Sequence, residues 1–127
     1  MTPGRLDLAG FRYTPFSESF LFRGVDLTGA VMKMQIRDRR DGGAVRATLN
    51  TVMTDVEGLR LISVGTEDGL DVSTVAIAID QATIDDMPTA PEIGDDIALW
   101  WDIHITTGGL KQRWLEGVFT VRAGVTQ

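Results

Sequence analysis

The sequence predicts an all-β protein: an antiparallel β-sandwich, immunoglobulin-like in the loose sense, with one short helix near residues 80–87. Apolar and polar residues alternate with a period of two over much of the chain, as they do in half-buried strands. Turn signals recur about every 8–12 residues and separate about six to eight short strands. A length of 127 residues and an apolar fraction of 43% suit one domain with one core. A small barrel is the alternative architecture.

The first clear hairpin is expected between residues 30 and 50. In AVMKMQIR (30–37) every second residue is apolar, which is typical of a strand with one buried face. The charged run at 37–43 contains two glycines and predicts a turn, and the alternation resumes at 45–50. The segment 52–64 is interrupted by a turn at 55–58 and does not alternate strictly. It is compatible with a bulge or with a strand buried on both faces.

The second half of the chain begins with an expected polar loop, GTEDGLD, at 65–71. A strand rich in β-branched residues follows at 72–79, and one of its faces carries only small side chains. The helix over 80–87 is expected to start at an Asp80 cap and to stop before Pro88. Two further strands, at 97–105 and at about 110–122, are expected to form a hairpin around the glycine turn at 106–109.

The chain is expected to hold an N-terminal arm over residues 1–14 and a single sandwich domain over residues 15–127. The arm has no clear period, and it is expected either to be flexible or to become ordered on a neighbour. The apolar faces of the strands define the predicted core. Its members are Met32, Met34, Ile36, Leu49, Leu61, Ile77, Leu99, Trp101, Ile103, Leu115 and Phe119.

Composition excludes several classes of function. The absence of cysteine excludes disulfide scaffolds, cysteine zinc sites, iron–sulfur clusters and cysteine nucleophiles. A single histidine excludes multi-histidine metal sites. No apolar stretch approaches the ~20 residues of a membrane helix, and the N-terminus lacks the apolar region of a signal peptide, so we expect no membrane partner. We also expect no cofactor and no resident metal.

Charge is unevenly distributed along the chain. The net charge of −6 argues against nucleic acid as a partner. Residues 1–54 carry eight basic and five acidic side chains (+3), 55–102 carry one and twelve (−11), and 103–127 carry three and one (+2). Solvated acidic loops explain this pattern simply. Alternatively, acidic loops of one copy meet Arg37, Arg39 and Arg40 of the next in a head-to-tail contact.

The acid–base candidate in the sequence is a pair on one strand. Asp102 and His104 are two residues apart, so their side chains point to the same face, and a general base is conceivable there. No G-x-S-x-G motif or cysteine supplies a nucleophile, and a surface neighbour pair is the simpler interpretation. Three groups of acidic residues raise the separate question of a calcium site. None has the spacing of an EF-hand: the cluster within 65–71, the Asp85-Asp86 pair and the Asp95-Asp96 pair. Solvated turn carboxylates are the simpler interpretation there, and a loop calcium site is the alternative.

Tryptophans supply the remaining candidate surface. Trp101 shares an apolar face with Leu99 and Ile103 and is expected in the core. Trp100 and Trp114 fall on faces that carry polar residues, and if their strands pair, the two rings are expected near each other on the less buried face. Such a pair is typical of a protein interface or of a carbohydrate-binding platform.

Three segments resemble small structural proteins of tailed phages and prophages. They are FLFRGVDLTGAVMKMQIRDRRDGGAV (20–45), VSTVAIAIDQATIDDMP (72–88) and WWDIHITTGGLKQRWLEGVFTVRAGVTQ (100–127). The "DLTGA–strand–turn" opening is similar to the N-terminal β-sandwich domain of siphophage baseplate upper proteins. The order and spacing of the segments, over residues 16–127, carry the resemblance.

The resemblance implies a function without catalysis. It implies a multi-copy structural or adaptor subunit of the virion, in the tail, baseplate or head–tail region, assembled in the bacterial cytoplasm. Its partners would be other virion proteins and further copies of itself, and the interaction residues expected from the sequence are Arg37, Arg39, Arg40, Trp100 and Trp114. The chain stops at Gln127, before the shaft and receptor-binding parts of longer relatives, which argues against direct host recognition. The alternatives are a capsid decoration protein, a carbohydrate-binding module of a host-recognition apparatus, and a hydrolase using Asp102 and His104.

Overall fold

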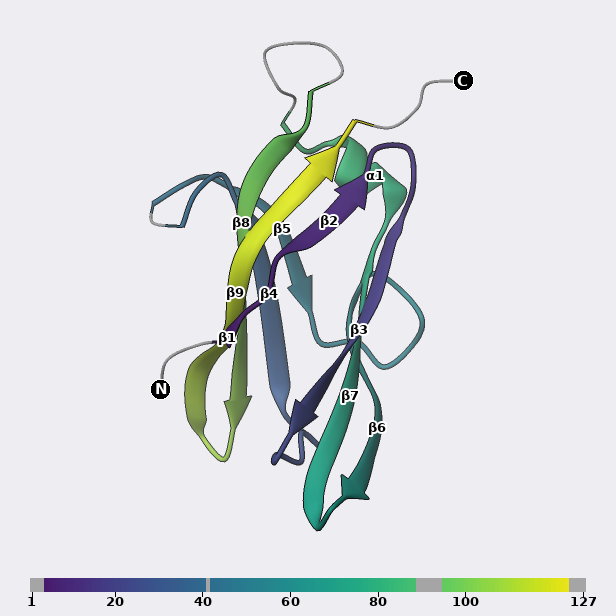
Figure 1. Cartoon of the computed structure of the whole chain (residues 1–127), viewed down its shortest axis with the longest axis vertical. Helices are drawn as coiled ribbons and strands as arrows, with labels where there is room; N and C mark the ends of the chain where they lie inside the picture. The colour runs from purple at the N-terminus through teal and green to yellow at the C-terminus, as the bar shows by residue number, and fades with distance from the viewer. Residues whose placement is uncertain (1–3, 41, 89–94, 124–127) are drawn as a thin grey trace.

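Two β-sheets packed face to face form the body of the protein in the computed structural model, which describes residues 4–40, 42–88 and 95–123 (Figure 1). The predicted all-β sandwich is therefore confirmed. The two sheets are joined near one edge, where Thr51 forms a parallel bridge with Leu59 and Val52 N–H donates to the Leu59 carbonyl.

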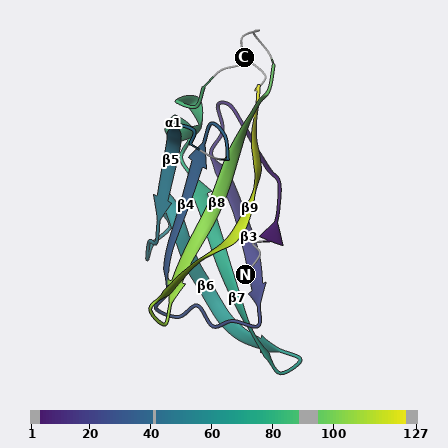
Figure 2. The same ribbon diagram turned by 90° about the vertical axis from the view of Figure 1, so that its left-hand side faces the viewer.

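The larger sheet is built on four antiparallel strands. They are β4 (Val31–Arg37), β5 (Val45–Asn50), β8 (Ile97–Thr107) and β9 (Leu110–Arg122), which lie side by side in the order β9-β8-β4-β5 (Figure 2). Both predicted hairpins, β4–β5 and β8–β9, are confirmed. Gly108 and Gly109 both have positive φ, the backbone geometry of a two-residue hairpin turn.

The N-terminal residues add to this sheet. Strands β1 (Gly4–Arg5) and β2 (Leu8–Phe11) run parallel to β9 on its outer edge. The described part of the expected arm therefore lies on the chain's own last strand. This edge departs from the antiparallel pairing predicted for the sandwich.

The smaller sheet has the order β3-β7-β6, with β3 (Phe16–Arg23), β7 (Leu70–Ile79) and β6 (Gly58–Glu67). The loop expected over 65–71 is wrong: both strands run through it and turn at Asp68-Gly69, whose φ values are 53° and 80°. The irregularity expected in 52–64 is a bulge, because a register shift leaves Ile62 without a partner on β7. Residues 62–71 are all exposed, and this hairpin projects beyond the body (Figure 1).

The helix α1 (Gln81–Asp85) lies where it was predicted but is shorter than 80–87. The expected side-chain cap by Asp80 is wrong, because its side chain makes no capping hydrogen bond. Glu57, from the connection between β5 and β6, binds the start of the helix instead. Its carboxylate accepts hydrogen bonds from Asp80 N–H at 2.8 Å and from Thr83 Oγ1 at 2.6 Å.

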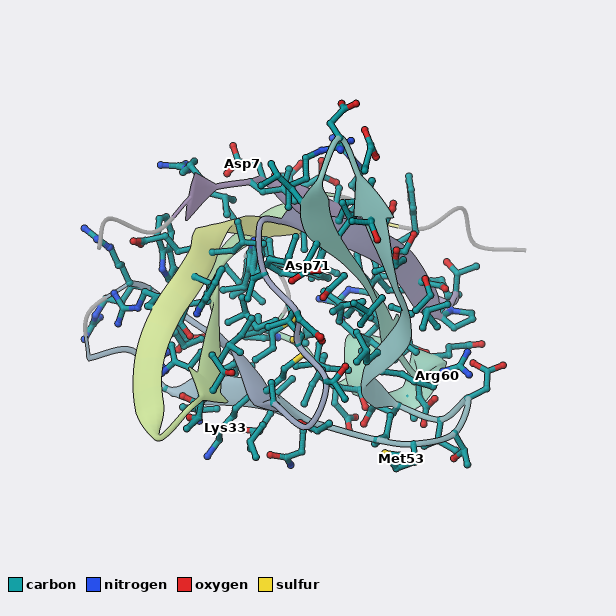
Figure 3. The ribbon with its side chains drawn as sticks, turned by 90° about the horizontal axis from the view of Figure 1, so that it is seen from below. Asp7, Lys33, Met53, Arg60 and Asp71 are labelled. Atoms are coloured by element: carbon teal, nitrogen blue, oxygen red, sulfur yellow. The ribbon has the colours of Figure 1, made fainter. Side chains whose placement is uncertain are left out.

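The core fills the space between the sheets, as the view along the strands shows, whereas Asp7 and Lys33 lie on the outside of the molecule (Figure 3). Nine of the eleven predicted core residues are buried, and Leu61 and Leu115 are partly buried against the others. Several further buried residues, which the alternation pattern did not predict, complete this core. They are Phe16, Phe22, Leu27, Leu59, Ile79, Ile84 and Met87.

Candidate interaction surface

The outer face of the larger sheet is polar along its centre. Trp101 and Ile103 point into the core, so Trp100, Asp102 and His104 point outward from β8. Asp102 lies directly opposite Glu116 of β9. Both carboxylates are buried although they lie on the outer face, with 3% and 6% of their surface exposed.

Arginines cover these two carboxylates. Arg40 Nε and Nη2 donate to the two oxygens of Glu116 at 3.0 and 3.1 Å, which is a bidentate pair. Arg113 Nε lies 3.4 Å from Asp102 Oδ2. A carboxylate removed from water is costly unless it is paired, so these arginines are required for the sheet face to be stable. The Arg40–Glu116 pair fixes the β4–β5 turn onto β9, and the Arg113–Asp102 pair links the neighbouring strands β9 and β8.

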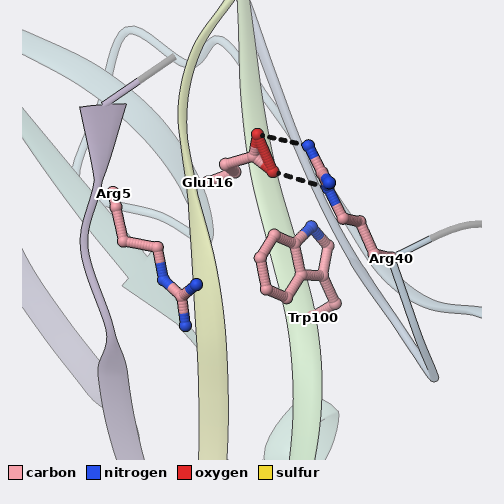
Figure 4. A pocket seen from close by; sticks show the side chains of 4 residues that line it. All are labelled: Arg5, Arg40, Trp100 and Glu116. Carbon is pink, nitrogen blue, oxygen red and sulfur yellow. Dashed lines mark hydrogen bonds and ion pairs between the residues drawn. The ribbon is translucent and has the colours of Figure 1, made fainter. Parts of the chain in front are cut away.

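Trp100 lies in a shallow, open pocket of about 190 Å³ lined by Arg5, Arg40 and Glu116 (Figure 4). The guanidinium carbons of Arg5 and Arg40 lie 5.2 and 5.6 Å from the indole centroid, within the range of cation–π attraction. Trp100 Nε1 is buried and has no hydrogen-bond partner among the described residues. The two cations and the indole therefore form one partly exposed patch at the edge where β1 joins the sheet.

Trp114 does not belong to this patch. A register shift between Ile103 and His104 makes Trp114 an extra residue in β9, and its ring turns toward the core, 6.0 Å from Phe22. The expectation that the Trp100 and Trp114 rings lie near each other is therefore wrong, because the bulge places them on opposite sides of the sheet. The arrangement offers no two-ring platform for a sugar.

The three arginines of the β4–β5 turn differ in their surroundings. Arg37 is half-buried and its guanidinium donates to Gln35. Arg39 and Arg40 are exposed, and Arg40 is held by Glu116. Beside them, Arg46 forms a bidentate pair with Asp38 at 2.6 and 2.8 Å, which the sequence analysis missed. This Arg46 hydrogen bond is the main reason that the pKa of Asp38 lies below its ordinary value.

Asp102 and His104 do share a face, as their spacing predicts. His104 Nε2 lies 3.8 Å from Asp102 Oδ2, and it accepts a hydrogen bond from Arg113 Nε at 3.3 Å. An arginine cannot give up its proton to that nitrogen, so Nε2 acts here as an acceptor for a structural contact. The pocket beside Trp100 is lined by Arg5, Arg40, Trp100 and Glu116, and His104 is not among these four residues.

The β6–β7 and β4–β5 turns carry opposite excess charge. The β6–β7 turn region, 66–71, carries three acidic side chains and no basic one. The β4–β5 turn region, 37–46, carries four arginines and two aspartates. These two turns lie toward opposite ends of the long axis (Figures 1 and 2). Arg23 of β3 lies beside the acidic turn and forms an ion pair with Glu67 at 2.7 Å.

Comparisons with family models, with curated proteins and with solved structures find no match to this chain. Within the described residues, no helix has the length and apolar character to cross a membrane. In the same part of the chain, no three potential ligand side chains are grouped as a metal site.

Proposed function

We propose that this protein is a non-enzymatic structural or adaptor subunit of a phage or prophage particle, used in multiple copies in the tail, baseplate or head–tail region. It acts by binding further copies of itself and other virion proteins. The sequence resemblance and the distribution of charge support this proposal independently of each other.

The segments that carry the resemblance correspond to successive elements of one fold. Residues 20–45 run from the end of β3 through β4 to the start of β5, 72–88 include most of β7 and all of α1, and 100–127 include most of β8 and β9. This correspondence supports the resemblance without identifying a family.

The observation that carries the proposal is the opposite excess charge of the β6–β7 and β4–β5 turns. A heterologous contact joins one surface of a copy to a different surface of the next, and such contacts build rings or filaments. The acidic β6–β7 end and the arginine-rich β4–β5 end are suited to such a contact, because complementary potentials orient the partners and fix their register. Exposed charges interact over a Debye length of about 10 Å at 0.1 M salt, so the contact is expected to weaken as salt rises.

Charge-neutralising variants test this contact. The double variant Asp68→Asn, Asp71→Asn removes two charges from the acidic end, and asparagine tolerates the positive φ of residue 68. A control variant, Asp55→Asn with Asp86→Asn, removes the same charge from exposed residues elsewhere. We expect the first variant to lower the average mass in sedimentation equilibrium and the control to leave it near that of the wild type. Equal masses for all three proteins would contradict the end-to-end contact.

The flanking genes test the particle location. Genes for tail or baseplate proteins are the expected neighbours, and capsid genes would favour the decoration role instead. A neighbourhood without any particle genes would contradict the proposal.

A further inference from the structure

The N-terminal strands are attached to the body by contacts that another copy of the chain would reproduce. Strand β1 pairs with Leu115 and Glu116 of β9, and β2 pairs along β9 as far as Arg122. Between these strands, Leu6 N–H donates to the Glu116 carbonyl at 2.9 Å, and the Leu6 carbonyl accepts from Trp101 Nε1 at 3.0 Å. We call residues 4–12 the arm.

Arg12 anchors the far end of the arm. Its backbone N–H donates to the Arg122 carbonyl at 3.0 Å. Its guanidinium donates to the carbonyls of Ile84, Asp85 and Met87 at 3.0–3.3 Å, and also to that of Pro88. These partners all belong to the end of β9 and to the end of α1. The arm therefore carries its own anchor to a receptor site formed by other parts of the body.

The connection between the arm and β3 is strained. Tyr13 has a φ of 68°, a left-handed conformation that is unfavourable for a residue with a Cβ. The turn is held closed by an exposed hydrogen bond from Tyr13 N–H to Asp85 Oδ1 at 2.9 Å. Pro15 favours an extended backbone for Thr14. Opening of the connection would thus relieve the strain at Tyr13 and give an extended segment leading to β3.

We propose that copies of this protein exchange their arms, so that residues 4–12 of one copy pair with β9 of a second copy in the register seen within one chain. The closed and exchanged forms make the same arm contacts. They differ in the conformation of residues 13–15 and in the entropy lost when two copies associate. The inference therefore rests on the proposed multi-copy function, which would bring copies close together. Crowding of copies in an assembly raises their effective concentration and favours exchange.

The absence of cysteine permits a direct cross-linking test. Ala9 and Thr120 are partners on β2 and β9, and neighbouring strands lie within the distance that a disulfide spans. Ala9→Cys and Thr120→Cys chains, the second with a mass tag, are mixed under reducing conditions, incubated and then oxidised. Exchange predicts a disulfide-linked heterodimer on a non-reducing gel. The matched control mixes Ala9→Cys with Thr48→Cys, an exposed position on the distant strand β5.

Variants of the connection between the arm and β3 are expected to change the heterodimer yield in opposite directions. Tyr13→Gly relieves the strain of the closed turn and is expected to lower the heterodimer yield by about threefold or more. Asp85→Ala removes the acceptor that holds the turn closed and is expected to raise the yield. A yield no higher than that of the Thr48→Cys control would overturn the exchange. A double variant with both cysteines that forms no disulfide within or between chains would overturn it too, since the arm would not lie on β9.

The outcomes separate this inference from the proposed function. In one outcome the protein forms multimers while the Ala9→Cys and Thr120→Cys chains fail to cross-link. This outcome would overturn arm exchange but would remain consistent with the end-to-end contact. A cross-linked heterodimer whose mass is unaffected by Asp68→Asn, Asp71→Asn would support exchange and contradict the end-to-end contact. Monomers without cross-links would contradict both.

Discussion

Replacement of Gly117 by alanine is expected to detach the N-terminal strands from the larger sheet. A Cβ at position 117 would lie 1.9 Å from the Leu6 carbonyl oxygen and 3.0 Å from Asp7 Oδ1. The first distance is far shorter than any real contact, and the clash is with backbone, which a side-chain rotation cannot relieve. Gly117 pairs with Trp101 in the centre of the sheet, so the arm is the part expected to move.

The expected loss of stability follows from the contacts at Leu6. Two hydrogen bonds would be lost. Loss of the bond to the Glu116 carbonyl has a net cost of about 1 kcal/mol. The Trp101 indole is buried, and leaving its N–H unpaired costs about 1–3 kcal/mol. The total is about 2–4 kcal/mol, a large part of the ~5–15 kcal/mol that stabilises a typical domain.

Urea unfolding followed by tryptophan fluorescence measures this loss, and hydrogen exchange of the amides of residues 6–11 reports the detachment. Gly65→Ala is the matched control, because Gly65 also lies within a strand and a Cβ there meets open space. We expect the control to unfold within about 1 kcal/mol of the wild type. Wild-type stability and wild-type protection of the arm in the Gly117→Ala protein would refute the packing of Leu6 described here.

Three further changes have expected outcomes. Ser73→Ala leaves the buried Leu27 N–H without its acceptor and is expected to cost about 1–3 kcal/mol in urea unfolding. The pKa of Asp7 is lowered from 3.8, first by the Val118 N–H hydrogen bond, so its stabilisation of the arm is complete above pH 3.8 and is lost as pH falls below it. A fluorescence titration should show this loss in the wild type and not in Asp7→Ala. Arg12→Ala is expected to lower stability by about 1–3 kcal/mol and to speed proteolysis near the N-terminus.

Elements with one buried face could be predicted from the sequence. The alternation in β4 and β8 is clear because Met34, Ile36 and Trp101 face the core while their neighbours face water. The arm gave no such signal, because β2 is a four-residue edge strand that is largely exposed. The β6–β7 turn did carry a signal, the Asp68-Gly69 pair, which is typical of a two-residue hairpin.

The interaction surface was less predictable than the fold. A single extra residue in β9 moves Trp114 to the core side, and such a bulge leaves no mark in the apolar pattern. The pair between Arg40 and Glu116 joins residues 76 positions apart and depends on how the β4–β5 turn folds back. Pairing of this kind follows from tertiary structure and not from local sequence.

The motif DLTGA illustrates how a sequence pattern can have a local structural cause. Asp26 Oδ1 accepts hydrogen bonds from the Thr28 N–H and hydroxyl, Leu27 is buried, and Gly29 has a φ of 75°. Each of these roles stabilises a turn before β4. The motif alone therefore predicts a turn, and the resemblance to phage proteins depends on its order with the other segments.

Self-association of the chain is tested most directly by its mass in solution. Sedimentation equilibrium of the wild-type protein over a range of concentrations measures this mass. We expect an average mass above the 13.9 kDa of one chain, rising with concentration and falling as salt is added. A mass of 13.9 kDa at every concentration and salt level would contradict self-association.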